Sequence, residues 1–355
     1  MSRRTIGCKS FVNKIGILIA QLGTPEAPTT SALRAYLKQF LSDPRVVEVN
    51  RVLWWLILRL FILTTRPSRS ANLYKGLWTE EGSPLLVITK RQVAGLQKAL
   101  SGLSAEVEVD FGMRYGKPSL EHGIDTLIDR GCSRILLLPM YPQYSAATSA
   151  STYDVVFAHL LKRRFVPTLR VAEPFFVSSE YILPLAHIIN SQMSELSSPV
   201  DHLILSYHGV PQSYVDKGDP YCCMCTETTM ALTSQLNIPR DRVIHTYQSR
   251  FGKDPWLKPY TDETIADLAA KGVKRIAVAC PGFPTDCLET IDEIGREARH
   301  EFMKLGGEDL IFITGLNDCP EWIEGMRSLV EKEISSWLEG ETLKADVGIT
   351  CPGVR

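Results

Sequence analysis

The sequence predicts an α/β protein built from two doubly wound parallel-sheet domains related by internal duplication. Three sequence signatures recur in the same order in the two halves of the 355-residue chain. Nearly continuous apolar runs alternate with amphipathic segments, a pattern typical of parallel strands covered by helices on both faces. The length also suits two domains better than one. We expect the first Rossmann-like domain over residues 14–170 and the second over residues 171–335.

Each signature combines a strand-like run with a turn. The first ends in Gly-x-Pro, the second reads Arg-aromatic-Gly-Lys before a proline, and the third opens with Arg-Ile and runs into proline. Their paired positions are residues 15–25 with 202–211, 113–118 with 249–255, and 131–143 with 272–284. Three ordered pairs indicate a repeated unit. Because open α/β sheets bind ligands beyond the carboxyl ends of their strands, we expect the following loops to border one cleft.

The first half contains an insertion. The separation between the first and second signatures is 91 residues in the first half and 41 in the second, so 50 residues are added, near positions 33–84. Within them, residues 51–63 carry 11 apolar side chains interrupted only by Arg59. This run is too short to span a bilayer. It is either a buried helix or an apolar lip beside the cleft that meets a hydrophobic ligand and the membrane surface.

Composition narrows the function classes. With 39 Lys+Arg and 40 Asp+Glu, the chain has no global field that would hold nucleic acid. Nine irregularly spaced cysteines favour a reducing compartment, and we expect a cytoplasmic protein. The apolar run at residues 15–20 is too short for a signal sequence. Residues 340–355 lack periodicity, which predicts a mobile tail.

One histidine and a series of glutamates suggest chemistry at the cleft. His208 ends the strand of the first signature in the second half, although a histidine in this place is more often structural. Glu289, Glu293 and Glu297 follow a helix-capping pair at 285–286 with i, i+4, i+8 spacing. A solvated helix also shows such stripes, but like charges at this spacing repel and call for cations or protons. If Glu289 faces His208, the pair suits divalent-metal capture and proton removal.

The motifs resemble the ferrochelatase family along residues 14–335, and proteobacterial members are the most similar. The strings that carry the resemblance are LGTPEAPT, GSPL, MRYGKPS, PMYPQYS, SYHGVPQSYVDKGDPY, QSRFGKDPWLKPYTDETI and CPGFPTDCLETIDEI. The resemblance implies a chelatase-like double domain. It also implies a lyase that inserts Fe2+ into protoporphyrin IX and forms protohaem, the last step of haem biosynthesis.

The resemblance also implies roles for individual residues. His208 would be the proton acceptor and border the metal, and Glu289 with Glu293 would supply carboxylates for the metal and protons, with the division of roles left open. The implied porphyrin contacts are Leu22, Tyr74, Ser83, Arg114, Tyr115 and Trp256. Implied partners are protoporphyrin IX and ferrous iron, with peripheral contact to the inner membrane or to the preceding porphyrinogen oxidase.

The cysteines leave an iron–sulfur cluster open. Some family members hold a [2Fe-2S] cluster with one mid-chain cysteine and three in a C-terminal extension. Here the mid-chain position is Ala146 and the tail has only Cys351, so we do not expect that arrangement. An internal set remains as an alternative to unliganded thiols: Cys223, Cys225, Cys280 and Cys287. Cys287 also replaces a histidine of animal members, and a soft ligand there would change which metals compete.

Four other functions would place different demands on the sequence. A coproporphyrin III ferrochelatase would share the fold and the site. A non-catalytic haem or porphyrin carrier would need one axial ligand and no series of glutamates. A sirohydrochlorin chelatase would call for a more polar pocket than the Trp54–Trp55 segment suggests. A glycosyltransferase with two Rossmann-like domains ranks last, because no Gly-rich phosphate loop with an acidic ribose-binding residue is found.

Overall fold

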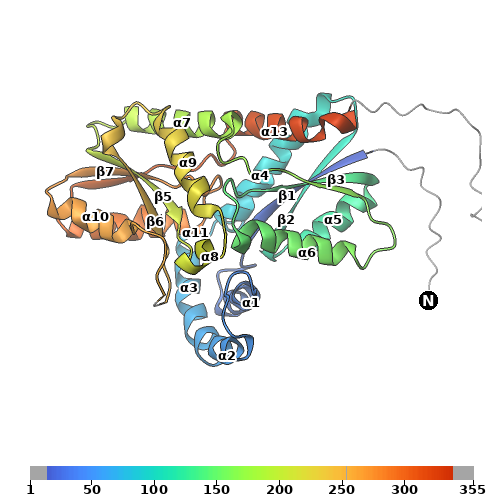
Figure 1. Ribbon diagram of the computed structural model, residues 1–355, viewed down its shortest axis with the longest axis horizontal. Helices are drawn as coiled ribbons and strands as arrows, with labels where there is room; N and C mark the ends of the chain where they lie inside the picture. Colours follow the sequence, from blue (N-terminus) through green and yellow to red (C-terminus); the bar gives the residue numbers. More distant parts are fainter. Residues whose placement is uncertain (1–13, 253, 339–355) are drawn as a thin grey trace, which may run out of the picture.

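A computed structural model describes residues 14–252 and 254–338, which form two four-stranded parallel sheets (Figure 1). The first sheet has the order β2-β1-β3-β4, formed by β1 (Lys14–Thr24), β2 (Val107–Gly116), β3 (Cys132–Pro139) and β4 (Thr168–Val171). The second has the order β6-β5-β7-β8, formed by β5 (His202–His208), β6 (Val243–Gln248), β7 (Arg275–Ala279) and β8 (Asp309–Phe312). The strand order repeats, which confirms the predicted duplicated α/β fold.

The three signatures mark equivalent strands. β1 corresponds to β5, β2 to β6 and β3 to β7, and all of these neighbours pair in parallel. The fourth pair, β4 and β8, was not predicted from the sequence. Each is four residues long and only partly buried, so neither shows the long apolar run that marks the other strands.

Helices cover both sheets. The α-helices are α1 (Thr30–Leu41), α2 (Arg51–Ile57), α3 (Leu63–Leu77), α4 (Pro84–Ala99), α5 (Leu120–Asp129), α6 (Ser151–Leu160), α7 (Ser179–Ser194), α8 (Gln212–Asp216), α9 (Tyr221–Thr233), α10 (Thr261–Ala270), α11 (Leu288–Ile291), α12 (Arg299–Lys304) and α13 (Pro320–Leu338). Three π-helical turns are η1 (Leu58–Ile62), η3 (Ala146–Ala150) and η5 (Glu293–Ala298), and two 3-10 turns are η2 (Leu100–Gly102) and η4 (Arg240–Arg242).

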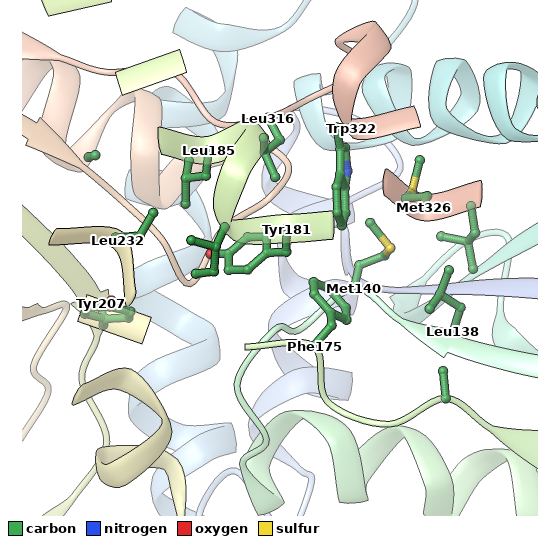
Figure 2. Close-up of a cluster of buried hydrophobic side chains, with 14 of the residues drawn as sticks. Leu138, Met140, Phe175, Tyr181, Leu185, Tyr207, Leu232, Leu316, Trp322 and Met326 are labelled. Atoms are coloured by element: carbon green, nitrogen blue, oxygen red, sulfur yellow. The ribbon is translucent and has the colours of Figure 1, made fainter. Parts of the chain in front are cut away.

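A single apolar core joins the two halves. Alternate side chains of the strands face it, such as Ile17 in β1 and Leu205 in β5, while the opposite face of each sheet packs on a smaller core of its own. Figure 2 shows Tyr181 and Trp322 within the shared core, and both contact Phe175, with ring centroids 5.5 Å and 5.7 Å away. The edge-on and tilted geometries are favourable for aromatic pairs.

The last helix connects the halves. α13 packs against α7 and α4, and Figure 1 shows α7 and α13 along one side of the molecule. Arg134 of β3 donates to the carbonyl of Trp337 in α13 (3.1 Å). The final helix therefore covers the first sheet, and the division at residue 170 stays a prediction. The expected tail at 340–355 lies outside the described residues.

The insertion forms a helical projection made of α1, α2, η1 and α3 (Figure 1). One side of the α2–η1 segment, with Trp54 and Leu58, packs against α1. The segment also has large apolar side chains that are exposed, which we call the apolar lip: Val52, Leu53, Trp55, Leu56, Leu60 and Phe61. The segment is therefore a partly buried helix with exposed apolar side chains, and its contact with a ligand or a membrane stays a prediction. Among the described helices, none combines the length and apolar character needed to cross a bilayer.

Gly325 tests the close packing of α13 on α7. A Cβ at this position would lie 2.2 Å from the Glu180 carbonyl oxygen, and backbone atoms cannot move aside easily. Gly325→Ala should lower the free energy of unfolding by about 1–3 kcal/mol, as overpacking does in other cores. The control is Gly102→Ala, where the added methyl meets no atom within 4 Å. Urea unfolding followed by circular dichroism measures both, and equal midpoints would contradict this packing.

Candidate functional site

His208 lies at the edge where the strands of the second sheet end. It is the last residue of β5 and half-buried, and it pairs with Gln248, the last residue of β6. Its Nδ1 atom lies 2.6 Å from the carbonyl oxygen of Gly209. Because a carbonyl can only accept a hydrogen bond, Nδ1 carries the proton and Nε2 is the basic nitrogen.

The end of β6, the strand next to β5, holds the segment that carries Glu289, Glu293 and Glu297. We call residues 286–297 the acidic segment. Gln248 donates to the backbone carbonyl of Glu289 (2.8 Å), and the Ser249 hydroxyl donates to the Glu293 carboxylate (2.6 Å). Burial raises the pKa of Glu293, the Ser249 hydrogen bond and His208 oppose that rise, and the charge of Glu289 adds to it. Glu293 is therefore close enough to His208 and to Glu289 for its charge to interact with each of them.

The three glutamates do not share one regular α-helix, so the expected spacing is wrong beyond Glu293. The N–H of Glu297 bonds to the Asp292 carbonyl (2.8 Å), five residues earlier, within the π-helical turn η5. This wider turn shifts Glu297 to the surface. There it lines an open hollow of about 540 Å³ with Arg296, His300 and Glu301. The acidic groups thus run from the strand edge to solvent.

Two tyrosines of the insertion complete the surroundings of Glu289. Burial raises the pKa of Tyr36 and of Tyr74 well above the usual value, and the negative charge of Glu289 adds to both shifts. They come from α1 and α3 and pack with Leu22 and Tyr115 in one apolar cluster. The sequence predicted Tyr74 and Leu22 as porphyrin contacts, which stays a prediction, and it did not single out Tyr36. The spacing of apolar residues in α1 indicates a buried face but not what that face meets.

Arg114 and Tyr115 are engaged by a buried carboxylate that the sequence did not suggest. The Arg114 guanidinium contacts Asp43 and donates to the Ser151 hydroxyl (2.6 Å), and the Tyr115 hydroxyl donates to Asp43 (2.8 Å). Burial raises the pKa of Asp43, but hydrogen bonds from Ser151, the Arg45 backbone and Tyr115, together with the Arg114 charge, outweigh burial and lower it. Asp43 therefore stays ionised and orients both predicted residues.

The remaining predicted contacts occupy two different settings. Trp256 borders the His208 loop, because a Cβ on Gly209 would lie 3.1 Å from the Trp256 ring. Ser83 is buried and caps α4, and its hydroxyl accepts the N–H of Leu86 (3.3 Å). The structure therefore places Trp256 beside the histidine, whereas the Ser83 side chain already serves a helix end.

The four candidate cluster cysteines do not come together. Cys225 packs in the shared core and Cys280 in the core on the opposite face of the second sheet. Cys223 is exposed, and Cys287 begins α11. Over residues 14–252 and 254–338, no group of three or more His, Cys, Asp or Glu is arranged to hold a metal ion.

Comparisons with known proteins show the family to which this chain belongs. The ferrochelatase family model matches residues 14–334. A protein of Marinobacter nauticus named ferrochelatase is 47% identical over 326 residues, which cover 92% of this chain and 88% of the relative. A ferrochelatase of Herminiimonas arsenicoxydans is 46% identical over 324 residues, covering 91% and 88%.

Solved structures agree on the fold. SirB from Bacillus subtilis with Fe3+ superposes with a TM-score of 0.53 at 14% identity, covering 92% of this chain and 98% of that chain. A cobalt complex of the sirohydrochlorin chelatase SirB gives a TM-score of 0.52 at 13% identity, with the same coverage. Identity this low shows a shared fold alone. The family match over nearly the whole chain goes further: this chain belongs to the ferrochelatase family.

Proposed function

We propose that this protein is a protoporphyrin ferrochelatase, a lyase that inserts Fe2+ into protoporphyrin IX and forms protohaem, the last step of haem biosynthesis. The observation that supports this function is the interaction of Glu293 with both His208 and Glu289, in a chain that the family model matches over residues 14–334. Relatives that share 45–47% of its residues are named ferrochelatases.

Metal insertion requires a base that accepts the pyrrole protons and negatively charged groups that hold the incoming metal ion, and the site offers both. A porphyrin must lose two pyrrole N–H protons as the metal enters, so a base must face the ring. The Nε2 atom of His208 is that base, and the Gly209 carbonyl holds Nδ1–H in place while the ring becomes an imidazolium. Glu289 and Glu293 supply negative charge for the Fe2+ substrate and for the imidazolium. Glu297 at the surface would collect cations from solvent.

The porphyrin would lie between the strand edge and the insertion. Leu22, Tyr74 and Trp256 provide apolar and aromatic surface for a flat macrocycle, and Arg114 would contact it. Tyr115 is wholly buried and would act through Asp43, which it helps to hold beside Arg114. The contact of Ser83 with a propionate also remains a proposal. Two propionates suit this apolar setting better than the four of coproporphyrin III. A carrier would bind porphyrin in equal amounts without turnover, and the names of the relatives favour the enzyme.

An iron–sulfur cluster on Cys223, Cys225, Cys280 and Cys287 is not part of this function. Cys225 of α9 lies in the core on one face of the second sheet, and Cys280 lies in the core on the other face. Bringing both to one cluster would require the sheet to open. Iron enters here as the substrate.

We place the protein in the cytoplasm with peripheral contact to the inner membrane. The apolar lip exposes Phe61 (65%) and Leu60 (61%), and the chain carries no acidic residue between Glu48 and Glu80. A basic segment with exposed apolar side chains binds anionic lipid surfaces. Such contact would bring the site near membrane-dissolved porphyrin or near the preceding porphyrinogen oxidase.

His208→Ala tests the base. Loss of a positioned proton acceptor should lower turnover by about 10²–10⁴-fold while porphyrin still binds. Absorbance of the metalloporphyrin, formed anaerobically from protoporphyrin IX and Fe2+ or Zn2+, measures the rate, and fluorescence quenching measures porphyrin binding. His187→Ala, an exposed histidine of α7, is the control and should keep full activity. A His208→Ala protein as active as this control would rule out the role.

Glu293→Gln tests the raised carboxylate pKa. A Glu with a raised pKa stabilises the fold fully below its unfolded value, near 4.5, and loses that contribution as pH rises through the folded value. The variant should therefore gain stability relative to the unmodified protein between pH 4.5 and pH 8, while its activity falls. Urea midpoints across this range measure the difference. Glu297→Gln, at an exposed position, should show no such trend, and a flat difference for Glu293→Gln would contradict the shift.

The double variant Leu60→Ser/Phe61→Ser tests the apolar lip. Removing two large exposed side chains should weaken binding to phosphatidylglycerol-containing vesicles by at least about tenfold. The matched control is Phe157→Ser/Leu161→Ser, which removes an exposed pair outside the insertion. Vesicle co-flotation measures both. Equal losses, or none, would show that the lip does not meet the membrane.

A further inference from the structure

Two residues other than glycine have left-handed backbone conformations in the described chain, and both hold the acidic segment. Ser249 has φ 66° and Asn317 has φ 50°. Side chains make this conformation costly, and such residues concentrate at functional sites. Ser249 donates to Glu293, and Asn317 bonds to Asp286. Asn317 belongs to the loop after β8 and had no assigned role.

Asn317 forms several hydrogen bonds with the start of the acidic segment and with the residues just before it. Its Oδ1 accepts the backbone N–H of Asp286 (2.9 Å), and its Nδ2 donates to the Asp286 carboxylate (2.7 Å). Its own N–H donates to the carbonyl of Pro284 (2.8 Å). The preceding residue, Leu316, is buried in the shared core, where Figure 2 shows it. Asn317 is thus anchored next to the shared core.

Asp286 connects Asn317 to the first turn of α11 through hydrogen bonds. Its carboxylate, almost wholly buried, also accepts the Thr290 hydroxyl (2.9 Å) and the N–H of Gly315 (3.1 Å). The Thr290 hydroxyl oxygen in turn accepts the N–H of Cys287 (3.1 Å), which closes the first turn of α11. Glu289 lies in that turn. A shift of Asp286 must therefore shift Glu289.

The first half of the chain takes part in the same network. Gln92 of α4, wholly buried, donates to the Asn317 carbonyl (2.7 Å) and to the Thr285 hydroxyl (2.9 Å). Gln21 of β1 donates to the same hydroxyl (3.1 Å). These bonds fix the loop before α11 to the half that carries the insertion.

We propose that Asn317 is a positioning residue for metal insertion. It sets the place of Glu289 in the first turn of α11 by holding Asp286, and it links that place to the first half through Gln92. This role rests on the proposed ferrochelatase function.

Asn317→Gly tests the role without imposing backbone strain. Glycine accepts the left-handed conformation and keeps the bond from Gln92 to the main-chain carbonyl, so only the two side-chain hydrogen bonds to Asp286 are lost. In the metalloporphyrin assay, kcat should fall at least about tenfold and KM for the metal should rise. The porphyrin Kd should stay within about twofold of the value for the unmodified protein, because Leu22, Tyr74 and Trp256 are unchanged. A purely structural role would lower stability without this split.

Two further variants complete the test. Asn190→Ala removes an amide with the same two kinds of bond, to the carbonyl of Gln235 (2.9 Å) and from the N–H of Asn237 (2.8 Å), and should leave kcat unchanged. The exchange Asp286→Asn/Asn317→Asp restores an amide–carboxylate pair and should turn over faster than Asp286→Asn alone. An Asn317→Gly protein with unchanged kcat, or an exchange with no recovery, overturns the role. Unmodified protein that forms no metalloporphyrin overturns the proposed function instead, and the role with it.

Discussion

Three carboxylates lie wholly or largely out of water near the strand ends, and the need to supply each with hydrogen-bond donors organises the site. Removing a carboxylate from water is costly unless donors or cations replace the lost solvation. Asp43, Asp286 and Glu293 come from different elements, and each meets a polar side chain distant in sequence. These contacts draw the insertion, the loop after β8 and the loop after β6 towards one edge.

The hydrogen-bond donors around Asp43 and Glu293 differ, and the pKa values of the two carboxyl groups shift in opposite directions. Asp43 receives a guanidinium and several hydrogen bonds, which lower its pKa despite burial and keep it charged. Glu293 receives the hydrogen bonds of Ser249 alone, so burial prevails and its pKa rises. A carboxylate with a raised pKa takes up and releases a proton more readily at neutral pH. Of the two, Glu293 is therefore suited to proton and cation exchange beside His208.

The insertion serves two surfaces at once. Its inner face brings Tyr36 and Tyr74 beside Glu289 and buries them with Tyr115 of the first sheet. Its outer face leaves the apolar lip uncovered. An apolar projection that both closes over the strand edge and stays exposed is unusual for a purely structural helix, since exposed apolar patches mark contact surfaces. A hydrophobic, planar substrate that partitions into membranes would meet the outer face at the membrane and the inner face at the site.

The sequence by itself determined the duplicated parallel-sheet fold and the place of His208 at the end of a strand. Repeated apolar runs mark buried strands, and parallel strands end on the same side. It missed β4 and β8, whose four residues carry too little apolar pattern. Only the tertiary structure decided which groups meet: Asp43 with Arg114, Asn317 with Asp286, and the π turn that sends Glu297 to the surface. These partners lie 31 or 71 residues apart, so their meeting depends on how the elements dock, and local periodicity carries no record of docking.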